Sequence, residues 1–261
     1  MSEIIYEKIG RIGKIVLNRP EVRNAFNMAM IDKWHTALET AKFDSDIRVI
    51  VVTGEGKAFC AGGDLNEIER NSNDTSIERK EFLWKGVHKV AFSLLDLDKP
   101  VIAAVNGAAF GAGLDMAMHC DIRLVAASAK LSESYVKVGL VPGNGGTYWL
   151  PRLVGMAKAA EMFFTGCIID ATEAKRIGLV NEVYPDEELM SKAMEMAETI
   201  ADGPPIQMAM IKRQLRQAMN SSLKDHLDFA SSNMSIAMDT EDRIEALNAF
   251  KEKRKPNFLG R

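Results

Sequence analysis

The chain has 261 residues, with 33 Lys and Arg against 36 Asp and Glu and a formal net charge of −3. That length accommodates one large domain, or a core with a small appendage, without a disulfide or metal to hold it together. The balanced charge argues against an extended surface for nucleic acid or for anionic lipid.

Strands and helices alternate in the sequence up to residue 202. In chain order the pattern predicts strands over 4–8 and 14–17, a helix over 27–43, a strand over 49–53, a short helix from Asp64, a helix over 77–95, a strand over 101–105, a helix over 113–119, strands over 122–126 and 130–134, helices over 155–165 and 171–177, a strand over 178–183 and a helix over 186–200. The polar segment 71–76 is predicted to be a surface loop.

The segment Asp202-Gly-Pro-Pro205 is the strongest candidate for a domain boundary, because glycine and proline interrupt regular structure. Beyond it the pattern is helical only, over 206–219, 223–238 and 241–253. We therefore predict an α/β core over 1–202 and a helical C-terminal region over 203–261.

Two glycine-rich turns, each following an apolar strand, are the most informative feature of the sequence. The first is Ala58-Phe-Cys-Ala-Gly-Gly-Asp64, and the second is Gly107-Ala-Ala-Phe-Gly-Ala-Gly-Leu-Asp115. Glycine lets the backbone approach a ligand where a side chain would block it. Two such turns can place two N–H donors on one developing oxyanion. Asp115 is the last residue of the second turn and lies in the first turn of the helix that follows, where a carboxylate either acts as a base or only caps the helix. Asp64 is equally a candidate cap.

Several common site patterns are missing from the sequence. It contains no phosphate-binding loop and no Gly-x-Ser-x-Gly nucleophile turn, and the four histidines lie too far apart in sequence to suggest a metal site. The three cysteines are scattered, which is typical of a reducing compartment, and the charged N-terminus does not resemble an export signal. We therefore expect a cytoplasmic protein with no membrane span and no bound metal.

The sequence resembles the enoyl-CoA hydratase/isomerase (crotonase) superfamily over nearly its whole length. The matching motifs occur in the family's order: Asn18-Arg-Pro20 with Asn24-Ala25, Phe59-Cys-Ala-Gly-Gly-Asp-Leu65, Asn106-Gly-x-x-x-Gly-x-Gly113, Cys120-Asp-Ile122, Gly139-Leu-Val-Pro142 with Gly145-Gly-Thr147, Ala171-x-x-Ala174 with Gly178-Leu-Val180, and Ala249-Phe-x-x-Lys-Arg-Lys-Pro256. The resemblance implies an α/β spiral of ββα units with a C-terminal helical extension.

The resemblance also implies an active site that binds an acyl-CoA thioester. Transferred by position, the backbone N–H groups of Gly63 and Ala112 would hold the thioester oxygen as it becomes an enolate, aided by the helix dipole at Ala112. No cofactor is expected beyond the coenzyme A of the substrate. The resemblance further implies a homotrimer or a dimer of trimers.

The same resemblance implies a set of coenzyme A contacts. Arg23 would lie near the pantetheine and phosphate arm, and the backbone near Ala61, Asp64 and Leu65 would lie near the adenine. Phe250 and Lys253 of an adjacent subunit would complete the nucleotide site. The alternative for the basic residues 251–255 is a solvated chain end.

The acidic pair of the family's hydratases is not conserved in this sequence. Where those enzymes carry two glutamates, this chain has Asp115 and, twenty residues later, Tyr135. Tyrosine has an ordinary pKa near 10, so it is a poor base at neutral pH, but it can donate a hydrogen bond or order a water. Packing beside the acyl chain is the alternative role for Tyr135.

Three interpretations of this pair follow. Asp115 alone could serve as base and acid of a hydratase, with Tyr135 orienting water or substrate. Asp115 could instead move a proton between carbons in a double-bond isomerase, although Gly143 and Asn144 stand where dienoyl-CoA isomerases carry a second acid. Glu133, two residues before Tyr135, could replace the missing acid if both lie on one face of a strand, but the strand pattern favours a solvent-facing Glu133.

We expect a hydratase most strongly, with an isomerase or an acyl-CoA hydrolase as alternatives. The unusual pair suggests a cyclic or aromatic-derived acyl group instead of a straight chain. A protein that binds acyl-CoA without catalysis is the alternative from another functional class. Exchange of substrate α-protons with D₂O separates this binder from the enzymes.

Overall fold

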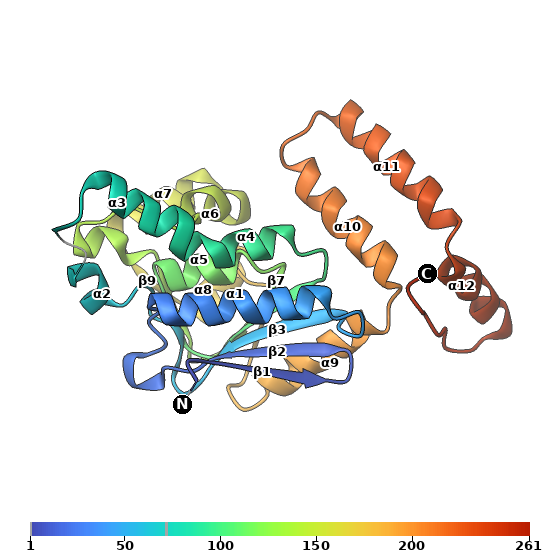
Figure 1. The fold of residues 1–261 in the computed structure, drawn as a ribbon, viewed down its shortest axis with the longest axis horizontal. Coiled ribbons are helices and arrows are strands. Elements are labelled where there is room, and N and C mark those ends of the chain that lie inside the picture. Colours follow the sequence, from blue (N-terminus) through green and yellow to red (C-terminus); the bar gives the residue numbers. More distant parts are fainter. Residues whose placement is uncertain (1, 71–72) are drawn as a thin grey trace.

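The structure is a computed structural model that describes residues 2–70 and 73–261. Its core contains a six-stranded sheet and a smaller four-stranded sheet (Figure 1). The larger sheet comprises, in spatial order, β1 (Ile4–Ile9), β2 (Ile12–Leu17), β3 (Val49–Gly54), β5 (Val101–Val105), β7 (Ile122–Ala126) and β10 (Glu182–Tyr184). The smaller sheet comprises β4 (Ala58–Cys60), β6 (Ala108–Phe110), β8 (Lys130–Ser132) and β9 (Ile168–Asp170).

The chain passes repeatedly from the larger sheet to the smaller one and then into a helix. β3 and β4 lead to α2 (Leu65–Arg70), and β5 and β6 lead to α5 (Ala112–Met118). β7 and β8 lead through a 3₁₀ helix (Ser134–Val138) to α6 (Gly146–Val154). Because β3, β5 and β7 are parallel neighbours, each passage turns the same way. The predicted α/β fold of ββα units is confirmed.

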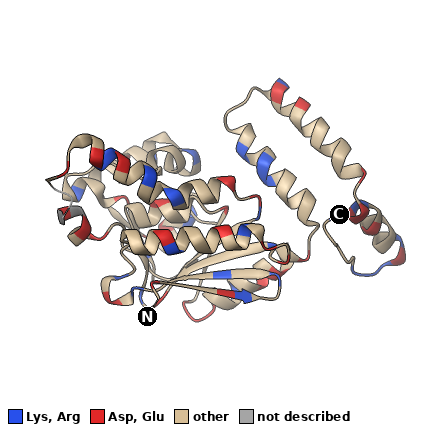
Figure 2. Ribbon diagram, in the orientation of Figure 1, with Lys and Arg blue, Asp and Glu red and all other residues tan. Residues whose placement is uncertain are grey.

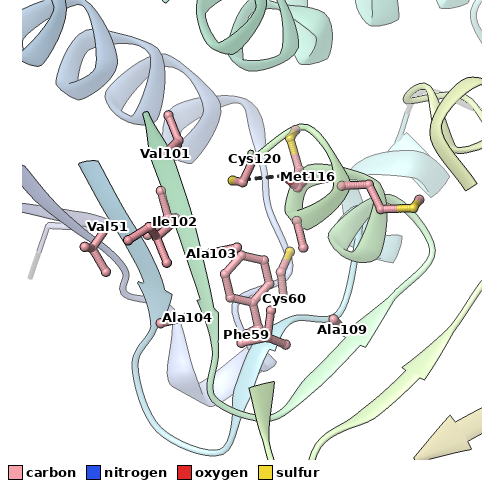
Figure 3. Close-up of a cluster of buried hydrophobic side chains, with 14 of the residues drawn as sticks. Val51, Phe59, Cys60, Val101, Ile102, Ala103, Ala104, Ala109, Met116 and Cys120 are labelled. Atoms are coloured by element: carbon pink, nitrogen blue, oxygen red, sulfur yellow. Dashed lines mark hydrogen bonds between the residues drawn. The ribbon is translucent and has the colours of Figure 1, made fainter. Parts of the chain in front are cut away.

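Helices cover the sheets and bury the long apolar strands between them. They are α1 (Met28–Phe43), α3 (Ser76–Glu81), α4 (His88–Asp96), α7 (Met156–Thr165), α8 (Ala171–Arg176) and α9 (Leu189–Ala201). All of β3 and β5 is buried, which explains their unbroken apolar sequence. Figure 3 shows Phe59 and Cys60 of β4 packed beside Ala103 of β5 and Met116 of α5. Both glycine-rich turns therefore extend from strands that pack in the same hydrophobic core.

Several predicted elements differ from the structure. The predicted helix over 77–95 is three segments, α3, a π-helical stretch (Phe82–Val87) and α4. The short strands β4, β6 and β9 and the helix α6 were not predicted, because three-residue strands carry no periodicity and glycine obscures the start of α6. In the predicted loop 71–76, residues 71–72 lie outside the described residues, and Thr75 caps α3.

The strand prediction over 130–134 was also wrong at its end. β8 stops at Ser132, and the 3₁₀ helix begins at Ser134. The period of two that would place Glu133 and Tyr135 on one strand face therefore does not apply.

Beyond residue 204 the chain forms α10 (Pro205–Ala218), α11 (Leu223–Met238) and α12 (Glu241–Glu252), which extend away from the sheets (Figure 1). α10 is fastened to the core by the buried Lys212, whose Nζ lies 2.6 Å from Asp121 Oδ2 and donates to the carbonyl of Lys99. No helix in the described ranges is long and apolar enough to cross a membrane.

Candidate active site

The two glycine-rich turns interlock at the ends of β4 and β6, which are parallel neighbours. Gly62 has a φ of +100°, and a Cβ built on it would lie 3.0 Å from the Phe110 carbonyl and 3.6 Å from the Ala112 nitrogen. A Cβ on Gly113 would lie only 2.1 Å from the Cys60 carbonyl. Only glycine at these two positions allows such close contact between the turns. The predicted meeting of the two turns is thus observed in the fold.

The backbone N–H groups of both turns are available where the turns meet. Ala112 is the first residue of α5, so its N–H has no acceptor within the helix. Gly63 pairs with Phe26 in an isolated bridge, in which Phe26 N donates to Gly62 and Asp64 N donates to Phe26. That pattern does not engage the Gly63 N–H itself.

Asp115 and Tyr135 form the central polar contact of the site. Asp115, in the first turn of α5, is fully buried. The Tyr135 hydroxyl, from the 3₁₀ helix that follows β8, donates a hydrogen bond of 2.5 Å to Asp115 Oδ2. The Tyr135 ring packs against Gly111, 3.6 Å from where a Cβ would lie. Tyr135 therefore contacts the residue next to Ala112 as well as the carboxylate.

Burial and this contact set the protonation of both groups. Burial raises the pKa of Asp115 above its ordinary value, and the hydrogen bond from Tyr135 acts in the opposite direction. Burial, followed by the negative charge of Asp115, raises the pKa of Tyr135. Tyr135 is therefore a neutral donor at physiological pH, and Asp115 is the member of the pair that ionises and can accept a proton.

Glu133 is buried, which corrects the expectation of a solvent-facing strand residue. Its exposed fraction is 0 %, because the chain turns inward after Ser132 instead of continuing as a strand. Burial, and then the negative charge of Asp115, raises the pKa of Glu133. The site thus contains a second carboxyl group that the strand pattern placed at the surface.

The loop before α6 and the first residue of α6, Gly146, close over Asp115. A Cβ on Gly146 would lie 2.2 Å from Asp115 Oδ1, so this position requires glycine. His119 Nε2 lies 2.8 Å from the Asn144 carbonyl, and Trp149 Nε1 donates to His119 Nδ1 at 2.9 Å. His119 is therefore neutral with its proton on Nε2, and burial lowers its pKa.

A second histidine anchors the same loop, since His88 Nε2 lies 2.7 Å from the Gly143 carbonyl. The sequence argued only against a metal site at the four histidines, and it did not connect His88 and His119 with Asp115. The spacing of four residues between Asp115 and His119 on one helix was the available signal.

A model of the enoyl-CoA hydratase/isomerase family matches residues 7–261 of the chain. The chain belongs to this family. A short-chain-enoyl-CoA hydratase of Clostridium acetobutylicum is 38% identical over 256 residues, covering 98% of this chain and 97% of the relative. The 2,3-dehydroadipyl-CoA hydratase of Escherichia coli is 36% identical over 262 residues and 100% of both chains. A solved enoyl-CoA hydratase from Bacillus anthracis superposes with a TM-score of 0.92 at 34% identity, covering 99% of this chain and 100% of that one.

As a member of the enoyl-CoA hydratase/isomerase family, the protein is an enzyme of the carbon–oxygen lyase type. Among the described residues, no cluster of three or more His, Cys, Asp or Glu side chains could hold a metal ion.

The residues that the family resemblance assigns to coenzyme A lie in two separate regions of the chain. Near the first glycine-rich turn, Ala61 N donates to the carbonyl of the exposed Arg23, and Leu65 is 64% exposed. The Asp64 carboxylate is engaged by Arg19 at 3.0 Å and by the N–H of Asn66, which fits the predicted cap. The family resemblance assigns the backbone of Asp64, and not its carboxylate, to the adenine.

Phe250 and Lys253 lie at the far end of the C-terminal region. Phe250 is on α12, where it is 83% exposed, and Lys253 ends that helix. Figure 1 shows α12 and α2 at opposite ends of the molecule. Within one chain the structure does not bring these two residues to the first glycine-rich turn.

Proposed function

We propose that the protein hydrates the double bond of an unsaturated acyl-CoA through an enolate held by the N–H groups of Gly63 and Ala112. The contact between Tyr135 and the buried Asp115 carries this proposal, because it places one basic carboxylate within one helical turn of Ala112. The names of the relatives as hydratases support the same reaction.

In the proposed reaction Asp115 acts as both base and acid. The oxygen of water bonds to the β-carbon while Asp115 accepts the proton that water loses. The electron pair of the double bond moves to the thioester oxygen, where two N–H donors stabilise the negative charge. When the enolate collapses, Asp115 returns a proton to the α-carbon, so that water has been added and no other reactant is consumed.

Tyr135 stabilises and orients Asp115 and does not itself transfer a proton. Its raised pKa keeps the hydroxyl neutral, and its hydrogen bond keeps Asp115 ionised in a buried position.

We also propose a cyclic or aromatic-derived acyl group. Trp84, His88 and Phe92 form an edge-to-face aromatic cluster, with centroids 5.1 Å apart between Trp84 and Phe92. His88 links that cluster to the loop that closes over Asp115. Flat apolar rings suit a ring-shaped acyl group better than a short straight chain.

Assembly as a homotrimer, or a dimer of trimers, is proposed on the apolar surface of the C-terminal helices. Leu215 and Met234 are 67% and 64% exposed on α10 and α11. Figure 2 shows no charge along the second half of α11. An adjacent subunit would cover this surface and present Phe250 and Lys253 to the adenine.

One assay tests the proposed function. The protein is incubated in D₂O with crotonyl-CoA, 2,3-dehydroadipyl-CoA and a cyclic dienoyl-CoA, and the products are followed by mass. Addition of one D₂O, fastest on the cyclic substrate, is expected. Deuterium uptake without added water would indicate an isomerase, free coenzyme A would indicate a hydrolase, and unchanged substrates that still bind would indicate a non-catalytic binder.

A further inference from the structure

Two carboxyl groups, Asp115 and Glu133, lie buried together in the site, and when both are ionised the Glu133 oxygens have no hydrogen-bond donor among the described residues. Asp115 Oδ1 and both carboxyl oxygens of Glu133 are inaccessible and make no hydrogen bond of good geometry with an N–H or O–H group of the described residues. Asp115 Oδ2 is already satisfied by Tyr135. The backbone N–H groups of Asn144 and Gly146 lie near Asp115 and lower its pKa, whereas nothing of this kind among the described residues faces Glu133. Two buried Glu133 oxygens without a donor would be costly if Glu133 were ionised.

A single proton on one of the two carboxyl groups removes this cost. The Asp115 and Glu133 side chains are close enough to hydrogen-bond to each other. If one of them carries a proton, that O–H donates to the other, and the repulsion between two buried like charges disappears. Asp115 accepts a donor at Oδ2 that favours its ionised form, whereas no described group donates to Glu133. The proton therefore belongs on Glu133.

We propose that Glu133 is a positioning residue for Asp115, a neutral carboxylic acid whose O–H donates to Asp115 Oδ1. Together with Tyr135 it holds the carboxylate from both sides, so that Asp115 stays ionised and fixed in orientation although it is buried. This role rests on the proposed function, in which Asp115 is the base. Glu133 itself does not transfer a proton to substrate.

The surroundings of Glu133 contain no other charge that would reverse this assignment. Asp115 of α5 is the only group that contributes to the Glu133 pKa besides burial, among the residues that the structure describes. Tyr135 of the 3₁₀ helix faces Asp115 as a neutral donor, and the backbone N–H groups of Asn144 and Gly146, at the start of α6, also lower the pKa of Asp115. No Lys, Arg or His within 2–70 or 73–261 contributes to the pKa of Glu133.

The first test needs no substrate. The infrared band of a protonated carboxyl group is recorded at neutral pH in the wild-type protein, in Glu133→Gln and in Asp115→Asn. The band is expected in the wild type and in Asp115→Asn and is expected to be lost in Glu133→Gln. A wild-type protein without the band, or one that loses it only in Asp115→Asn, would overturn the proposal.

The second test uses the pH profile of kcat/KM for hydration. Glu133→Gln keeps a neutral donor of the same shape. The acidic limb of the pH profile should therefore stay at the same pH, and kcat/KM should fall by less than about tenfold. Glu133→Leu removes the donor, so the limb moves up by about one pH unit, because the ionised form of Asp115 loses a hydrogen bond.

Other outcomes contradict the role of Glu133. A limb that moves to lower pH in Glu133→Gln would mean that Glu133 is ionised in the wild type. A loss of kcat beyond about a hundredfold in Glu133→Gln would mean that Glu133 transfers the proton itself. A wild type that hydrates no acyl-CoA contradicts the proposed function instead, and the infrared band still decides where the proton lies.

Discussion

The Tyr135 hydroxyl donates to Asp115 Oδ2 at 2.5 Å, and the two residues come from ββα units that follow one another along the chain. Asp115 lies on the helix after β6, and Tyr135 lies on the 3₁₀ helix after β8, the parallel neighbour of β6. The packing of adjacent spiral turns therefore positions the Asp115 carboxylate and its donor together. Removing either partner is expected to change the acid–base behaviour of the other.

Replacing Tyr135 with phenylalanine should raise the pKa of Asp115. The ionised carboxylate loses its donor at Oδ2, so the acidic limb of kcat/KM should move up by about one pH unit. Tyr184→Phe is the matched control, since Tyr184 lies on the edge strand β10. An unshifted limb in Tyr135→Phe would show that the hydroxyl does not stabilise the carboxylate.

Glycine at position 146 should be required for activity. A Cβ there would lie 2.2 Å from Asp115 Oδ1, so Gly146→Ala has to displace the carboxylate and should lower both kcat and the free energy of unfolding, the latter by about 1–3 kcal/mol. Gly143→Ala is the control, because its Cβ would make an ordinary contact of 3.7 Å with Leu83. The kcat and the thermal melts of both variants are measured. Equal values for Gly146→Ala and Gly143→Ala would contradict the close contact between position 146 and Asp115.

Asp115→Asn should stabilise the fold at neutral pH. A carboxyl group whose folded-state pKa is raised contributes stability below its unfolded pKa and loses it as pH rises through the folded-state value. The variant should therefore exceed the wild type by about 1–3 kcal/mol at pH 7, and the difference should shrink near pH 4. Denaturant melts at both pH values measure this, with the exposed Asp32→Asn as control. A difference independent of pH would not fit a buried, ionised Asp115.

Substrate binding should depend on Arg23 and Lys253. If both contact the phosphates of coenzyme A, either change to alanine should raise KM about three- to tenfold with little change in kcat. Lys130→Ala, at an exposed position on β8, is the control. An unchanged KM for Lys253→Ala would favour the alternative in which residues 251–255 are a solvated chain end.

The order of elements was predictable because long buried strands and amphipathic helices leave clear patterns, as β3, β5 and α1 do. The two glycine-rich turns were predictable for the same reason, since each follows such a strand. Glu133 was not, because its burial depends on where a three-residue strand ends. Strand length is set by pairing with β6 and β9, which local sequence does not encode.

The loop over Asp115 was missed on similar grounds. His88 and His119 each contact one carbonyl of residues 143–144 from different helices. Such contacts depend on the distance between elements remote in sequence, so no spacing rule predicts both. Tyr135 was found only through its position in the family resemblance.

The central claim is that Asp115 generates an enolate next to the N–H groups of Gly63 and Ala112. The most direct measurement is the exchange of α-protons of a saturated acyl-CoA with D₂O, because exchange requires the base and the oxyanion donors but no added water. We expect exchange by the wild type, a loss of at least about a hundredfold in Asp115→Asn, and normal exchange in Asp32→Asn. Exchange that persists in Asp115→Asn, or a wild type that binds acyl-CoA without any exchange, would contradict it.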